Sequence, residues 1–263
     1  MTPRMVKYPR THHLEGSRLQ PGDHDLSQVH LSTLQHVPLV IEEKLDGANA
    51  ALSFDHSGEL LLQSRGHYLT GGGREKHFAL FKTWAATHRK AFSEVLSDRY
   101  VVFGEWLYAK HTIYYDALPH YFMEFDVWDR RDEAFLSTPA RRRLLEPLPI
   151  AAVPVIHEGT LHRRDQLDAL VTRSLYKSDS WGEHLTETAA QQGLDVERVR
   201  DQTDRSELGE GLYIKREQEG RVVGRYKFIR HSFLQTVIAS DSHWLRRPII
   251  PNRLAEGVEV FET

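Results

Sequence analysis

Short apolar runs separated by polar turns dominate the chain, and such runs are typical of strands that join their neighbours as hairpins. Strands are predicted over residues 39–41, 50–54, 60–63, 100–108, 121–128, 153–157, 211–216 and 221–229. Helices are predicted over residues 76–97, from Thr138 and Pro139 onward, over much of 163–204 and over 232–239, whereas the polar residues 1–38 are predicted to be irregular. Because the strands adjoin instead of alternating with helices, the pattern predicts an α+β fold with mainly antiparallel sheets flanked by helices.

Composition narrows the class of protein. Hydrophobic residues make up 40% and charged residues 27% of the 263 residues, which is enough for a sizeable core, and no Gly/Ser/Pro-rich linker divides the chain, so we expect a single domain over 1–263. The formal net charge of −3 excludes a polybasic coat, and the absence of cysteine excludes disulfides, thiolate metal sites and a cysteine nucleophile. No signal-peptide core and no membrane-length apolar stretch occurs, which predicts a cytoplasmic protein with no membrane partner.

A lysine follows the first apolar strand directly, in the sequence Lys-Leu-Asp-Gly over residues 44–47. A lysine that leaves a buried strand into a glycine turn can point its amine into a pocket, where burial or nearby cations would lower its pKa and free a nucleophilic lone pair. Taken alone, Lys44 could equally be an exposed hairpin lysine beside an Asp46-Gly47 turn.

Two later strands carry carboxylates among apolar residues. Glu105 lies within 100–108, where an unpaired buried carboxylate is costly, so it either meets a ribose, a metal-bound water or an arginine, or it faces solvent. In 121–128, alternation places Phe125 and Met123 on one face and Glu124 and Asp126 on the other. Phe125 could therefore offer a platform for a base or simply belong to the core.

The closing pair of strands is basic. Residues 210–215 read Glu-Gly-Leu-Tyr-Ile-Lys, and the next strand carries Arg225 and Lys227 on one face. Two cations on one face repel unless an anion lies between them, and a phosphate is the natural candidate. An edge strand with solvated charges is the alternative.

The order and spacing of these pieces resemble the covalent nucleotidyltransferases, the superfamily of ATP-dependent DNA ligases, RNA ligases and mRNA capping enzymes. In the terms of that superfamily, motif I is 44–47, motif Ia contains Arg65, motif III is 104–105, motif IIIa is 125–126, motif IV is 210–215 and motif V is 225–227. The chain looks most like the RNA ligase 2 group, because the lead before Lys44 is short and a helical segment separates motifs IIIa and IV. Motif V departs from the usual Lys-x-Lys, and either Arg225 or Arg230 could fill its first basic position.

The resemblance implies the nucleotidyltransferase fold and an ATP-dependent RNA ligase that seals 5′-phosphate and 3′-hydroxyl ends through a lysyl-AMP intermediate and an adenylylated 5′ end. Lys44 would be the nucleophile, supported by Asp46, while Glu105 and Glu210 would bind the ribose or, through water, Mg²⁺ or Mn²⁺. The remaining contacts to ATP and RNA are implied for Arg65 (ribose or 5′-phosphate), Phe125 (adenine) and Lys215, Arg225 and Lys227 (phosphates).

The substrate is a weaker inference than the chemistry. Residues 221–253 hold seven Lys or Arg against one Asp, which suits an RNA backbone, in a nicked duplex or at broken ends, or a solvated surface. Arg141, Arg142 and Arg143 are expected on a helix surface, and His12, His13, His77, His111 and His120 in loops or on the surface.

The short stretch of sequence after the motifs leaves alternatives to RNA ligation open. Residues 231–263 form a short C-terminal extension after the motifs, too short for the OB domain of DNA ligases and capping enzymes. A minimal ATP-dependent DNA ligase, a GTP-using capping enzyme and a degenerate nucleic-acid-binding module therefore stay open as alternatives, and RNA end-processing partner proteins could replace the further domain.

Overall fold

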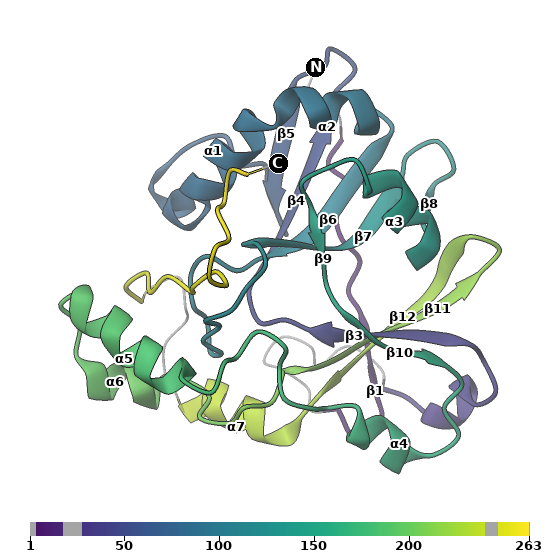
Figure 1. Cartoon of the computed structure of the whole chain (residues 1–263). Helices are drawn as coiled ribbons and strands as arrows, with labels where there is room; N and C mark the ends of the chain where they lie inside the picture. Colours follow the sequence, from purple (N-terminus) through teal and green to yellow (C-terminus); the bar gives the residue numbers. More distant parts are fainter. Residues whose placement is uncertain (1–3, 18–27, 240–246, 263) are drawn as a thin grey trace.

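Two six-stranded sheets face each other in the computed structural model, which describes residues 4–17, 28–239 and 247–262 (Figure 1). The first sheet, sheet A, has the order β10 (Val155–Gly159), β3 (Leu39–Lys44), β11 (Gly211–Gln218), β12 (Arg221–Ile229), β1 (His12–Leu14) and β2 (Gln28–Val29). Its first four strands are antiparallel, whereas β1 runs parallel to both β12 and β2. A 3₁₀ turn, η1 (Leu31–Leu34), leads into β3.

The second sheet, sheet B, lies above sheet A in Figure 1 and is antiparallel along its main path. Its order is β5 (Leu60–Ser64), β4 (Ala48–Phe54), β6 (Tyr100–Trp106), β7 (Phe122–Asp129) and β8 (Ala134–Phe135), and β9 (Ala151–Ala152) runs parallel to β7. The chain crosses from sheet A to sheet B between β3 and β4, which are separated only by residues 45–47.

Helices surround the two sheets (Figure 1). The segments η2 (Gly73–Phe78), α1 (Ala79–Thr87) and α2 (Arg89–Leu96) lie over sheet B, where the Phe81 ring packs 5.2 Å from Trp106 and 5.3 Å from Phe122. The remaining helices are α3 (Thr138–Leu145), α4 (Arg164–Ala169), α5 (Trp181–Gln191), α6 (Val196–Asp201) and α7 (His231–Ala239). Within the described residues, no helix is long and apolar enough to cross a membrane.

The predicted α+β class with mainly antiparallel sheets is confirmed, and two details of the prediction are wrong. The helix expected over 76–97 is divided at His88, between α1 and α2. Residues 1–38 are not wholly irregular, because β1 and β2 extend sheet A. These strands have three and two residues, so they are too short to give a periodic signal of their own; β1 forms by pairing with β12, and β2 by pairing with β1.

A network of buried charges joins the two sheets. Lys215 of β11 lies 3.0 Å from Glu42 of β3 and 3.1 Å from Asp126 of β7, and it also donates to the carbonyl oxygen of Phe125. Arg141 of α3 contacts both Glu42 and Glu124 of β7. Arg225 of β12 completes the network, 3.1 Å from Asp126. Three carboxylates thus meet three cations, so that each buried charge has an opposite partner.

Arg141 was expected on the surface of its helix, and that expectation is wrong for this residue. Its side chain is fully buried, whereas Arg142 and Arg143 are exposed. Consecutive helix residues point about 100° apart, so one of three adjacent arginines turns toward the sheets. The two carboxylates that receive its guanidinium lie on β3 and β7, far from Arg141 in the sequence.

We predict that Arg141→Met lowers the free energy of unfolding by about 3–5 kcal/mol, because it leaves two buried carboxylates without their cation. Urea denaturation of the variant and of Arg142→Met, which alters the adjacent exposed arginine, provides the measurement. A loss no larger for Arg141→Met than for this control would contradict the structural role of the network.

Candidate active site

Lys44 ends β3 and points its ammonium at a carboxylate. Its Nζ atom lies 2.6 Å from Oε2 of Glu210, and 24% of the Lys44 side chain is exposed against 2% for Glu210. Glu210 directly precedes β11, where Gly211 pairs with Lys44. A Cβ atom on Gly211 would lie 1.9 Å from the Phe228 carbonyl oxygen, so this glycine permits the close pairing of β11 and β12.

Glu105 reaches the same place from the opposite sheet. Its Oε1 atom accepts a hydrogen bond from the Gly47 amide at 3.1 Å, and β6 holds it in sheet B. A Cβ atom on Gly47 would come within 3 Å of Leu107, Glu105 and the Trp106 carbonyl oxygen, so only glycine lets the turn after Lys44 approach β6 this closely. The structure therefore brings Lys44, Glu105 and Glu210 together from two sheets.

The three groups control one another's charge. Burial alone lowers the pKa of Lys44, but the carboxylates of Glu210, Glu105 and Asp46 outweigh it and raise the pKa above its ordinary value. Burial raises the pKa of Glu105 to about 8 and that of Glu210 to about 7, although the Lys44 charge opposes both shifts. Such a pair of desolvated carboxylates favours additional positive charge between them.

Asp46 is fixed by a loop of sheet B. Its Oδ2 atom accepts hydrogen bonds from the amides of Thr112 and Ile113, both at 2.7 Å, and its own amide donates to the Tyr115 hydroxyl at 2.9 Å. Burial raises the pKa of Asp46, while the two amides and the Lys44 charge work against that shift. Asp46 therefore holds the turn that follows Lys44 and does not itself contact the Lys44 amine.

Phe125 lies at an irregularity of β7. Phe103 pairs with Asp126 and Gly104 with Glu124, so Phe125 is an extra residue that interrupts the alternation expected for this strand. Its half-buried ring packs edge-on against Tyr8 at 5.2 Å and lies 6.1 Å from the Tyr213 ring. The Tyr8 hydroxyl contacts both Asp126, at 2.5 Å, and the Tyr213 hydroxyl.

The basic residues of β11 and β12 separate into two groups. Lys215 and Arg225 lie in the buried charge network, and the Lys215 side chain has no exposed surface, so a phosphate could reach it only if that network opened. Lys227 is paired across the strands with Tyr213, which in turn pairs with Glu42, two residues before Lys44. The Lys227 charge opposes the rise in the pKa of Glu210.

Arg65 and the basic stretch 221–253 lie elsewhere. Arg65 is exposed in the turn after β5. Most arginines of the stretch face a carboxylate from another part of the chain, namely Arg221 with Asp132, Arg225 with Asp126, Arg230 with Asp204 and Arg253 with Glu187. These arginines therefore do not form one continuous cationic surface, and Arg246 lies outside the described residues.

The expectation that the histidines lie in loops or on the surface is wrong for His13, in β1, and for His77, in η2, which are both buried. It holds for the exposed His12 and for His111 and His120, which lie in the loop between β6 and β7, although both of these rings are buried and Nδ1 of His111 lies 4.0 Å from Asp46. Apolar residues from other parts of the chain bury these rings, so no local sequence pattern predicts their burial. In the described parts of the chain, no three His, Asp or Glu side chains are grouped so as to hold a metal ion directly.

Sequence reasoning missed the residues that support the site from a distance. Tyr115, Tyr8 and Asn252 contact Asp46, Asp126 and the loop after β6, and each contact joins residues far apart in the sequence. An aromatic residue in a loop, such as Tyr115, carries no signal of its own.

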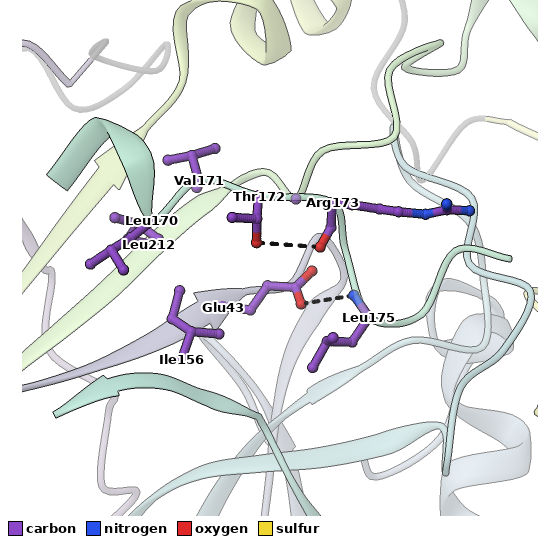
Figure 2. Close-up of a pocket in the computed structure, with 10 residues that line it drawn as sticks. Glu43, Ile156, Leu170, Val171, Thr172, Arg173, Leu175 and Leu212 are labelled. Atoms are coloured by element: carbon purple, nitrogen blue, oxygen red, sulfur yellow. Dashed lines mark hydrogen bonds between the residues drawn. The ribbon is translucent and has the colours of Figure 1, made fainter. Parts of the chain in front are cut away.

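Behind Lys44, Glu43 points to the other face of sheet A and into a small cavity of about 40 Å³ (Figure 2). The cavity is lined by Ile156, Leu170, Val171, Thr172, Arg173, Leu175, Gly209, Gly211 and Leu212. Oε2 of Glu43 accepts a hydrogen bond from the Leu175 amide at 3.4 Å, and among the described residues no donor reaches Oε1. Burial raises the pKa of Glu43 to about 7.

The fold and the arrangement around Lys44 define a nucleotidyltransferase-type protein, and comparisons with known proteins agree. The profile of the RNA ligase family matches residues 37–229, so the chain belongs to the RNA ligase family. A search by sequence among curated proteins found no match.

Solved structures of the RNA ligase of Naegleria gruberi share the fold. A variant with ATP and Mn superposes with a TM-score of 0.55 at 15% identity, one with AMP and Mn with 0.57 at 14%, and the enzyme with pyrophosphate with 0.55 at 16%. Each match covers 89% of this chain and 58% of the Naegleria chain, so the present chain spans little more than half the length of that ligase.

We predict that Glu43→Gln stabilises the protein at high pH. A folded-state pKa of about 7, above the ordinary value of 4.5, means that the native protein binds this proton more tightly than the unfolded chain. The stability contributed by protonated Glu43 is therefore complete below pH 4.5 and is lost as the pH rises through 7. Urea denaturation at pH 5 should show little difference from wild type, whereas at pH 8.5 the variant should gain roughly 2 kcal/mol.

The exposed Glu158 on the neighbouring strand β10 offers the control, because Glu158→Gln should have no such pH dependence. Equal stability changes for Glu43→Gln at both pH values would refute the raised pKa.

Proposed function

We propose that the chain is an ATP-dependent RNA ligase that joins 5′-phosphate and 3′-hydroxyl ends through a lysyl-AMP intermediate. One observation carries the proposal: the Lys44 amine at the end of β3 lies 2.6 Å from Glu210, with Glu105 against the adjoining turn, in a chain of the RNA ligase family. The Naegleria ligase, whose structures hold ATP, AMP and Mn, supports ATP and a divalent metal as the cofactors.

The first step uses Lys44 as the nucleophile. Its ammonium loses a proton to solvent, which reaches the partly exposed side chain, and the neutral amine attacks the α-phosphorus of ATP. A P–N bond forms, and the bond to the β-phosphate breaks as pyrophosphate leaves with its electron pair. Asp46 keeps the turn after Lys44 in place, and Lys227 is proposed to contact the α-phosphate.

The next two steps transfer the AMP and seal the ends. An oxygen of the RNA 5′-phosphate attacks the lysyl-AMP phosphorus, the P–N bond breaks and Lys44 regains a proton. The RNA 3′-hydroxyl then attacks the activated 5′-phosphate, and AMP leaves as the new phosphodiester bond forms. Phe125, with Tyr8 at its edge, is proposed to stack on adenine, and Arg65 to contact the ribose or the 5′-phosphate.

Glu105 and Glu210 fit a divalent metal held through water. Burial raises the pKa of both carboxylates, which is the response expected of acidic groups that lack sufficient positive charge nearby. When bound, Mg²⁺ or Mn²⁺ would neutralise phosphate charge and favour the neutral form of the lysine. A cytoplasmic location and RNA end-processing partner proteins are further parts of the proposal.

We predict that the wild-type protein becomes labelled when incubated with α-labelled ATP and Mg²⁺ and that Lys44→Ala does not. The label should survive denaturing electrophoresis because the P–N bond is covalent. Lys90→Ala, which alters a lysine that is 92% exposed on α2, is the matched control and should label like wild type. No label from ATP or GTP would favour the binding module, and label from GTP alone would favour a capping enzyme.

Sealing assays test the substrate separately. We predict that adenylylated protein joins a nick with a 5′-phosphate in duplex RNA, or single-stranded RNA ends, faster than the same nick in duplex DNA. Denaturing electrophoresis of the end-labelled strands measures both rates. If only the all-DNA nick is joined, the chain is a DNA ligase and the RNA assignment is wrong.

A further inference from the structure

The part of the β6–β7 connection over residues 107–116, here called the clamp loop, holds the turn that carries the nucleophile. It supplies the amides of Thr112 and Ile113 and the Tyr115 hydroxyl, all of which bond to Asp46 at 2.7–2.9 Å. Because Asp46 lies two residues after Lys44, a shift of the clamp loop would move the base of the Lys44 side chain. The clamp loop itself has no regular secondary structure, so its position depends on what it packs against.

Asn252 ties residues 247–262, here called the C-terminal segment, to the clamp loop. Its side chain donates from Nδ2 to the Leu107 carbonyl oxygen at 2.6 Å and accepts at Oδ1 from the Tyr115 amide at 3.0 Å. Its backbone amide donates to Tyr108 at 2.8 Å, and its carbonyl oxygen accepts from the Tyr121 hydroxyl at 2.9 Å. Asn252 is 1% exposed, so water does not replace these bonds.

The same Tyr115 carries both connections. Its amide is held by Asn252, and its hydroxyl accepts from the Asp46 amide. The path from the C-terminal segment to the nucleophile is therefore Asn252, Tyr115, Asp46 and Lys44, with one hydrogen bond at each of the first two steps and a covalent chain at the last. Asn252 lies beyond residues 37–229, the region that defines the family.

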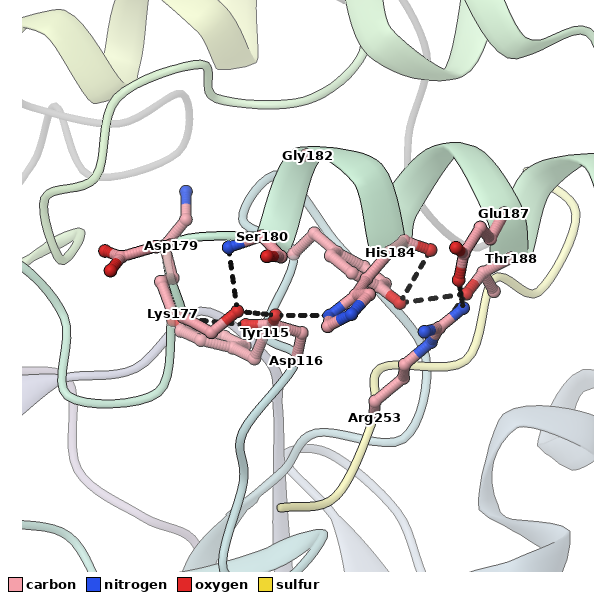
Figure 3. Close-up of polar contacts among 12 residues, drawn as sticks. Tyr115, Asp116, Lys177, Asp179, Ser180, Gly182, His184, Glu187, Thr188 and Arg253 are labelled. Atoms are coloured by element: carbon pink, nitrogen blue, oxygen red, sulfur yellow. Dashed lines mark hydrogen bonds and ion pairs between the residues drawn. The ribbon is translucent and has the colours of Figure 1, made fainter. Parts of the chain in front are cut away.

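Helix α5 braces the clamp loop from the other side (Figure 3). Asp116 accepts from the Ser178 amide at 2.8 Å and lies 2.7 Å from Nδ1 of His184. Arg253, next to Asn252, lies 3.1 Å from Glu187 of α5, and its own amide donates to the Tyr115 carbonyl oxygen at 2.9 Å. The clamp loop therefore lies between the C-terminal segment and α5.

We propose that Asn252 is a positioning residue for the adenylylation of Lys44 and that the C-terminal segment is part of the catalytic apparatus. The proposal rests on the proposed function of Lys44. Asparagine suits this role because one side chain supplies both the donor for Leu107 and the acceptor for Tyr115, which no aliphatic residue does. Without Asn252 the clamp loop loses its fixed position, Asp46 loses its alignment, and Lys44 meets the α-phosphorus less often in the reactive geometry.

The test compares Asn252→Ala with Tyr121→Phe. The control also removes a hydrogen bond to Asn252, the one that the Tyr121 hydroxyl donates to its carbonyl oxygen, but Tyr121 lies outside the clamp loop. At saturating ATP, Asn252→Ala should label Lys44 about 10- to 100-fold more slowly than wild type with a smaller change in the KM for ATP, whereas Tyr121→Phe should stay within about twofold. Thermal unfolding confirms that each variant is folded at the assay temperature.

A double-mutant cycle separates positioning from general destabilisation. Tyr115→Phe removes only the hydroxyl that holds Asp46, and the combination with Asn252→Ala should be little slower than Asn252→Ala alone, because both act through one path. Effects that multiply, a rate for Asn252→Ala equal to that of wild type, or an equal loss in Tyr121→Phe would overturn the proposal.

Two further measurements keep the test decisive. Hydrogen exchange of the peptide containing Asp46 should accelerate in Asn252→Ala but not in Tyr121→Phe, and this readout needs no activity. If Asn252→Ala does not fold, Asn252→Asp retains the shape and the acceptor for Tyr115 and should slow labelling by about 3- to 10-fold; an unchanged rate overturns the proposal. Failure of wild type to become labelled would instead contradict the proposed function.

Discussion

The charge network between the two sheets is the constraint on which the rest of the structure depends. Glu42 and Lys215 belong to sheet A, Glu124 and Asp126 to sheet B, and Arg141 joins them from α3. Even a small displacement of a buried charge is costly, because the charge loses its ionic partner in a place where water cannot take over the partner's role. The network therefore fixes the position of β3 relative to β7. Lys44 lies on the same face of β3 as Glu42, two residues further along the strand, so the same contacts fix the position of Lys44 relative to sheet B.

This arrangement also assigns different tasks to chemically similar residues. The motifs around β11 and β12 supply Lys215, Arg225 and Lys227, and all three looked equally suited to a phosphate. Burial separates them: Lys215 and Arg225 neutralise Asp126 and Glu42, whereas the charge of Lys227 acts on Glu210. Lys215 and Arg225 thus serve as partners of buried carboxylates, although the sequence alone would assign both cations to the substrate. A cation that is already paired in a dry interior contributes to substrate binding only at the cost of that pair.

Much of the fold class and the centre of the site could be predicted from the sequence, because both depend on local order. Apolar runs indicated the strands, and the resemblance of the ordered motifs to the covalent nucleotidyltransferases implied one site containing Lys44, Glu105 and Glu210. The surroundings could not be predicted. Arg141 was expected on a surface because a run of three arginines is usually solvated, and its partners on β3 and β7 become visible only in three dimensions. Asn252 and Tyr115 give no local signal, since an asparagine in a loop and a tyrosine between strands are common in any protein.

The site exists only where the two sheets meet. Lys44 and Glu210 belong to sheet A and Glu105 to sheet B, and the short connection through Gly47 is all that separates the end of β3 from β4. A nucleophile assembled in this way needs its two halves aligned to within a fraction of an ångström. The charge network aligns them along the strands, and the clamp loop aligns the turn that connects them. Both devices consist of contacts within the chain itself, so the alignment exists before ATP or RNA binds, and the chemistry does not have to create it.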